Sequence, residues 1–113
     1  MAPEARKFLW DALRASDFVA EFTDGRSFED YAADPMLRSA VERQFEIVGE
    51  ALAQLGKLDP ALAGGIPDLR RIVGFRNILA HGYSAVDDRV VWGVVEGNLP
   101  SLRACLRGLL GED

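Results

Sequence analysis

Apolar residues recur at intervals of three and four along most of this 113-residue chain, and this spacing limits the folds open to it. The first such run extends from Glu4 to Phe22, and later runs cover most of the remaining sequence. Intervals of three and four place apolar side chains on one face of an α-helix. Only the segment from Val90 to Val94 also fits a strand, and no second candidate strand is present to pair with its backbone groups. The spacing therefore predicts an all-α protein.

Capping residues and prolines indicate where the helices begin and end. Asp34 precedes Pro35, a combination typical of a helix start, and an apolar seam follows it as far as Leu55. Ser27 and Asp30 predict a short helix before this one. We expect helices over residues 4–22, 27–33, 35–55 and 66–81, and a last helical region over residues 87–110 that Pro100 either kinks or divides. These segments predict a compact up-and-down bundle of four to five helices.

Length and composition bound the class of protein. The length fits a single domain over residues 1–113, and 49% hydrophobic residues supply enough apolar surface for a core. No apolar run approaches the roughly 20 residues that span a bilayer, so no membrane partner is expected. The first ten residues lack the apolar stretch of an export signal, so we expect a cytoplasmic protein. With one cysteine, Cys105, and one histidine, His81, we expect no disulfide and no metal. The sequence contains no P-loop or dinucleotide-binding glycine pattern, so we expect no cofactor.

The charge balance limits how the chain can bind nucleic acid. Lysine and arginine number 13 and aspartate and glutamate 18, which gives a net charge of -5 at pH 7. This charge has the wrong sign for broad contact with a phosphate backbone. Any chemistry on a nucleic acid must therefore depend on a local site.

The helix expected over residues 66–81 places a charged side chain among apolar ones. At about 100° per residue, Arg76 falls in the middle of an apolar stripe, which comprises Leu69, Ile72, Val73, Leu79 and Ala80. An arginine in this position must be paired, extend its head into water, or lie near a cavity or a subunit interface. The sequence alone leaves these alternatives open.

Asn77 and His81 lie on another face of the same helix, because they are four residues apart. Gly74 shares this face, which is therefore polar and poorly filled. His81 is near the helix C-terminus, where an imidazolium interacts favourably with the helix dipole. Tyr83 returns to the side of Arg76, where its ring could anchor the end of the helix. Each residue alone thus has an ordinary structural explanation.

Taken together, these residues form an R-x4-H-x-Y pattern between Arg76 and Tyr83. The pattern resembles the motif of HEPN domains of the HepT type. The likeness covers most of the chain, because the segment from Arg43 to Ala51 resembles that family's long helix. Val91-Trp92 and Leu99-Pro100 resemble its last segment. The resemblance implies a helical bundle of the HEPN type that pairs as a homodimer.

The same resemblance implies an activity and a role for four residues. It implies an endoribonuclease that cleaves RNA without metal and serves as the toxin of a toxin-antitoxin pair. Arg76, Asn77 and His81 match the family's catalytic motif. Tyr83 matches the tyrosine that a cognate nucleotidyltransferase antitoxin modifies with AMP. RNA, a second copy of the chain and this antitoxin are the implied partners.

Helix geometry agrees with the implied dimer. Arg76 and His81 are five residues apart, about 140° around a regular helix, so one straight helix is poorly suited to aim both at one phosphate. A two-fold dimer would supply two histidines, one to deprotonate a ribose 2′-hydroxyl and one to protonate the leaving oxygen. Two other functions stay open, namely a catalytically silent dimer that binds a nucleotide or a nucleotidyltransferase, and a plain interaction bundle.

Three glutamates recur every four residues on the long helix, away from its apolar seam. They are Glu42, Glu46 and Glu50. A metal site would need converging ligands, so we interpret the three as a solvated face that contacts Arg43 or a partner.

Overall fold

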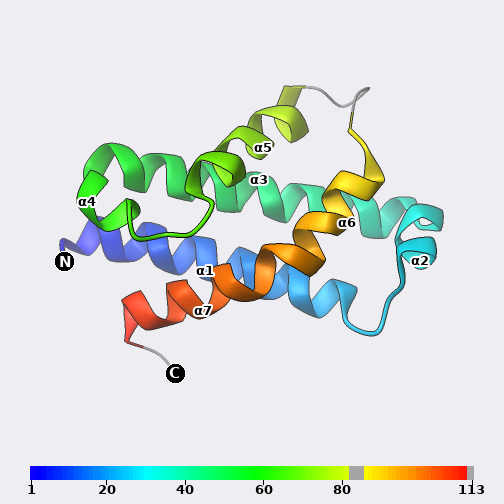
Figure 1. The fold of residues 1–113 in the computed structure, drawn as a ribbon, viewed down its shortest axis with the longest axis horizontal. Helices are drawn as coiled ribbons and strands as arrows, with labels where there is room; N and C mark the ends of the chain where they lie inside the picture. The colour runs from blue at the N-terminus through cyan, green and yellow to red at the C-terminus, as the bar shows by residue number, and fades with distance from the viewer. Residues whose placement is uncertain (82–85, 112–113) are drawn as a thin grey trace.

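A computed structural model describes residues 1–81 and 86–111, which form helices and no strand (Figure 1). The helices are α1 Pro3–Thr23, α2 Phe28–Ala33, α3 Pro35–Leu58, α4 Pro60–Ala63, α5 Leu69–His81, α6 Asp88–Gly97 and α7 Leu99–Leu110. Five of them have ten residues or more, and α2 and α4 have six and four. The predicted all-α class is confirmed. None of the helices in the described part of the chain is long and apolar enough to cross a membrane.

Side-chain caps explain two of the helix starts. The Ser27 hydroxyl accepts a hydrogen bond from the backbone N–H of Asp30 (3.1 Å), and the Asp30 carboxylate accepts one from the N–H of Ser27 (2.9 Å). This reciprocal pair satisfies donors that the first turn of a helix leaves free. The Asp34 carboxylate likewise accepts hydrogen bonds from the N–H groups of Met36 and Leu37 (both 3.1 Å). Both predicted caps are confirmed.

The start of α5 differs from the prediction. The helix begins at Leu69, so Pro67 precedes it and does not lie in its first turn. Asp68 has a φ of 59°, a left-handed conformation that a right-handed helix cannot contain. The Asp68 carboxylate also accepts a hydrogen bond from the Asn98 amide (2.7 Å), between α6 and α7. A contact between distant segments therefore accompanies the delayed start.

The helices run up and down around a central pair. Helices α1 and α3 are antiparallel, with α7 packed on α1 and α5 packed on α3 (Figure 1). One hydrophobic cluster lies mainly between α1, α3 and α7, and includes Leu9, Leu52 and Leu106. A second cluster includes Tyr31, Phe45 and Trp92 from α2, α3 and α6. Because α5 packs mainly on α3, one side of α5 faces solvent.

Candidate functional site

The buried stripe of α5 differs from the expected one at two positions. Ile72, Phe75 and Leu79 are buried, whereas Ala80 is exposed. The Phe75 ring meets Phe45 of α3 edge-on, with 5.6 Å between ring centroids. Including Phe75 shifts the centre of the stripe away from Arg76. Leu69 and Val73 are partly buried against the core, so Arg76 still lies within the stripe but away from its centre, with 24% of its side chain exposed.

The aliphatic part of Arg76 lies directly against the backbone of α3. A Cβ atom added to Gly49 would stand 2.4 Å from the Cβ of Arg76 and 3.1 Å from its Cγ. Real Cβ atoms do not approach so closely, so only glycine permits this distance between α3 and α5. A glycine in the middle of a helix costs about 1 kcal/mol relative to alanine. Its presence here is explained by the close approach of Arg76.

Replacing this glycine should weaken the α3–α5 contact. We expect Gly49→Ala to lower the free energy of unfolding by about 1–3 kcal/mol, because the added methyl forces two backbones apart. Gly56→Ala is the matched control on the same helix, since nothing lies within 4 Å of a Cβ added there. Gly56→Ala should raise the free energy of unfolding by about 0.5–1 kcal/mol, because alanine loses less backbone freedom on folding than glycine does. Urea unfolding of both variants measures the two effects. An equal gain in the free energy of unfolding in both variants would contradict the close contact between Gly49 and Arg76.

The guanidinium of Arg76 is held by two side chains. Its Nη1 donates to Oε2 of Glu50 (2.5 Å), while Nε and Nη2 donate to Oδ1 of Asn77 (3.2 and 2.8 Å). A guanidinium has five N–H donors, so three are engaged. Within residues 1–81 and 86–111, the other two have no protein acceptor, and one lies on each terminal nitrogen. This arrangement can bind two oxygens of a phosphate group.

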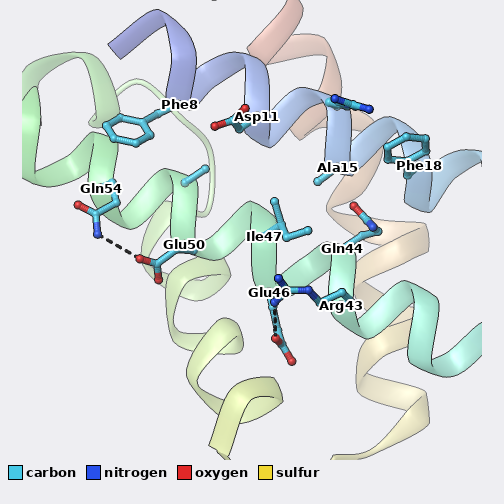
Figure 2. A pocket seen from close by; sticks show the side chains of 12 residues that line it. Phe8, Asp11, Ala15, Phe18, Arg43, Gln44, Glu46, Ile47, Glu50 and Gln54 are labelled. Atoms are coloured by element: carbon cyan, nitrogen blue, oxygen red, sulfur yellow. Dashed lines mark hydrogen bonds and ion pairs between the residues drawn. The ribbon is translucent and has the colours of Figure 1, made fainter. Parts of the chain in front are cut away.

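The three glutamates of α3 lie in different surroundings. Glu46 pairs with Arg43 (3.2 Å), as expected, and Figure 2 shows this pair. Glu50 accepts a hydrogen bond from the Gln54 amide (3.0 Å), also visible in Figure 2, and this bond together with that from Arg76 lowers the pKa of Glu50. Burial and the nearby Asp88 raise the pKa of Glu42. The interpretation as one solvated face is therefore too simple, because Glu50 belongs to the Arg76 cluster.

We call Arg76, Asn77, Glu50 and Gln54 the arginine cluster. It adjoins an open groove of about 420 Å³ between α1 and α3, which Phe8, Phe18 and Ile47 line together with Glu50 and other residues (Figure 2). Arg76, Asn77 and His81 do not line this groove. The groove and the arginine cluster therefore share Glu50 and Gln54.

The other predicted residues of α5 lie on its exposed side. Gly74, Asn77 and His81 are exposed, and nothing lies within 4 Å of a Cβ added to Gly74. This confirms the predicted open face. His81 is the last residue of α5, so it and Arg76 point to different sides of one helix, as their spacing indicates. Tyr83 lies outside the described residues.

Local charge around the motif differs from that of the whole chain. Helix α5 carries three arginines and no acidic residue, whereas the chain has a net charge of -5. Arg70 and Arg71 are exposed and form no ion pair within the described residues. The described residues also contain no group of three histidine, cysteine, aspartate or glutamate side chains that could hold a metal ion. The site thus presents cationic and hydrogen-bonding side chains.

Sequence reasoning missed two contributors to this site. Glu50 was recognised only as one of a series, and the pairing with Arg76 joins residues 26 positions apart. Gly49 was a usable signal, because a glycine between good helix formers in a long helix needs a packing reason. That signal would have indicated a close helix contact without identifying Arg76 as the neighbour.

Comparison with known proteins identifies the family. The profile described as ribonuclease HepT-like matches residues 12–109, so the chain belongs to the HepT-like family. The chain is 32% identical over 108 residues to "Putative RNase TTE0752" of Caldanaerobacter subterraneus subsp. tengcongensis, and the match covers 96% of this chain and 96% of the relative. It is 36% identical over 98 residues to "Probable ribonuclease HepT" of Thermococcus cleftensis, covering 87% of this chain and 88% of the relative. No solved structure gives a significant match.

The family assignment confirms the resemblance carried by the R-x4-H-x-Y pattern. The helical bundle agrees with the HEPN type that the resemblance implies. The catalytic roles of Arg76, Asn77 and His81, and the modification of Tyr83, stay predictions.

Proposed function

We propose that this protein is a metal-independent endoribonuclease that acts as the toxin of a toxin-antitoxin pair. The observation that carries the proposal is the arginine cluster, in which Glu50 and Asn77 hold Arg76 and leave two N–H donors without a protein acceptor in the described chain. The names of the relatives, which include "Probable ribonuclease HepT", support RNA as the substrate. The positive charge of α5 supports local phosphate binding in an otherwise acidic chain.

The proposed reaction uses the ribose 2′-hydroxyl as the nucleophile. A histidine accepts the proton of this hydroxyl while its oxygen attacks the adjacent phosphorus. The bond from phosphorus to the 5′ oxygen breaks, and a second histidine protonates that oxygen. The products are a 2′,3′-cyclic phosphate and a 5′-hydroxyl. Arg76 binds the phosphate and stabilises the charge that develops on its oxygens.

The cleavage chemistry can be tested directly. Wild-type protein should cut single-stranded RNA and leave 2′,3′-cyclic phosphate ends, while a DNA of the same sequence stays intact because it lacks the 2′-hydroxyl. EDTA should leave the rate unchanged, since no step uses a metal. No RNA cleavage, cleavage of the DNA, or inhibition by EDTA that added metal reverses would each contradict the proposal.

The need for two histidines requires a homodimer, because each chain carries one histidine. The open face of α5 is suited to the contact, since Gly74 permits close approach and Ile78 is 49% exposed. Sedimentation equilibrium at micromolar concentration should give twice the chain mass. Ile78→Asp should shift the equilibrium toward monomer and lower activity. Met36→Asp, which alters an exposed residue of α3, is the control and should leave the dimer intact. A wild-type protein that is strictly monomeric would contradict a site that uses histidines from two chains.

A second candidate function is a catalytically silent dimer that binds a nucleotide or a nucleotidyltransferase partner. The net charge of -5 favours it, because an acidic chain attracts RNA weakly. The RNA cleavage assay separates the two functions, since only the first predicts products.

We also propose that Tyr83 is the acceptor when a cognate nucleotidyltransferase inactivates the protein with ATP. An attached AMP adds negative charge and bulk two residues beyond His81, where it would compete with RNA for Arg76. Incubation with the partner enzyme and ATP should add AMP to the peptide that contains Tyr83, as mass spectrometry measures, and abolish cleavage. Tyr83→Phe should stay unmodified there and active. AMP on another peptide, or inactivation of Tyr83→Phe, would show that the mechanism is wrong.

A further inference from the structure

We propose that Glu50 is a positioning residue for RNA cleavage, which orients the guanidinium of Arg76 toward the scissile phosphate. This inference rests on the proposed ribonuclease function. Glu50 lies on α3, outside the R-x4-H-x-Y segment, and its carboxylate contacts the guanidinium at 2.5 Å.

Two consecutive residues of α3 hold the two parts of the arginine. Gly49 leaves room for the aliphatic stem, since an added Cβ would stand 2.4 Å from the Cβ of Arg76. Glu50 accepts a hydrogen bond from the charged head. One turn of α3 therefore positions both the aliphatic part and the guanidinium of Arg76.

The carboxylate of Glu50 is itself held at both oxygens. Oε2 accepts a hydrogen bond from Arg76. Oε1 accepts one from the Gln54 amide at 3.0 Å, and Figure 2 shows this second bond. The side chain of Glu50 is 56% exposed, so packing alone does not fix its orientation. Gln54 therefore contributes the second contact that orients the carboxylate.

The pairing should have opposite effects on substrate binding and on turnover. A carboxylate next to the phosphate site repels RNA, so its removal should strengthen binding. The same removal frees one end of the guanidinium, and a displacement of about 1 Å at a reacting centre can cost about 10²-fold in rate. Loss of Glu50 should therefore lower both KM and kcat.

The test compares Glu50→Ala, Glu50→Gln and a matched control in RNA cleavage under wild-type buffer conditions. The control is Glu46→Ala, which removes an equal charge one turn away from a glutamate that pairs with Arg43. Glu50→Ala should lower kcat by about 10- to 100-fold and also lower KM. Glu50→Gln should recover most of kcat, because its amide oxygen still accepts from Arg76, while KM stays low. Glu46→Ala should keep the wild-type kcat.

Several outcomes would overturn the proposal. Glu50→Ala with wild-type kcat would show that the pairing has no effect on turnover. Equal losses of kcat in Glu50→Ala and Glu50→Gln, with KM unchanged, would indicate structural damage, and thermal unfolding of both variants would identify it. Inactive wild-type protein would overturn the proposed function together with this inference. Active wild-type protein with insensitive Glu50 variants would overturn this inference alone.

Discussion

His81→Ala should lower the rate of RNA cleavage by about 10²- to 10⁴-fold while the protein stays folded. The loss is large because His81 is the only histidine of the chain, so a dimer of the variant has no general acid or base of this type. The fold should survive because the side chain is exposed at the last position of α5 and contributes little packing. Cleavage kinetics and urea unfolding of the same preparation measure the two effects separately.

The rate of this variant decides whether His81 takes part in the reaction. A wild-type rate in His81→Ala would exclude this residue from the chemistry. A loss of rate in a variant that keeps the wild-type free energy of unfolding assigns the loss to the chemistry.

Arg76→Lys should lower the rate of cleavage by about 10²- to 10³-fold, the usual effect of removing a donor that stabilises developing charge. Lysine keeps the charge but cannot supply the planar group that contacts Glu50, Asn77 and a phosphate together. Arg76→Lys should therefore lose most of the cleavage rate even though it keeps the net charge of the chain. Cleavage of a short RNA under single-turnover conditions measures it without interference from product release.

The control for this variant lies on the same helix. Arg71 is exposed and forms no ion pair within the described residues, so Arg71→Lys should cleave RNA at the wild-type rate. Equal rates for Arg76→Lys and wild type would show that charge alone suffices and that the geometry of the arginine cluster has no catalytic role. A similar loss of rate in Arg76→Lys and Arg71→Lys would indicate an effect shared by the arginines of α5 and not one specific to Arg76.

The helices that the sequence predicted well are those whose signals are local. The capping interactions of Ser27 and Asp34 involve neighbouring residues, so they can be identified without knowledge of packing. The start of α5 was misplaced, because Asp68 takes a left-handed conformation beside Asn98, 30 residues away. The sequence pattern does not identify Phe75 as part of the buried stripe of α5, because its burial depends on the contact with Phe45 of α3. Periodicity identified the helix correctly but did not define which neighbour it meets.

The sequence by itself determined that the chain is all-α, that Arg76, Asn77 and His81 share one helix, and that it resembles the HepT-like family, to which the chain belongs. These properties depend on helical period, caps and a short motif, all of which are local. Only the tertiary structure decided that Glu50 meets the guanidinium and that Gly49 admits its stem. Contacts between helices depend on the distance and angle at which they cross, and these follow from how all side chains of the interface pack together. The period of either helix alone does not contain that information.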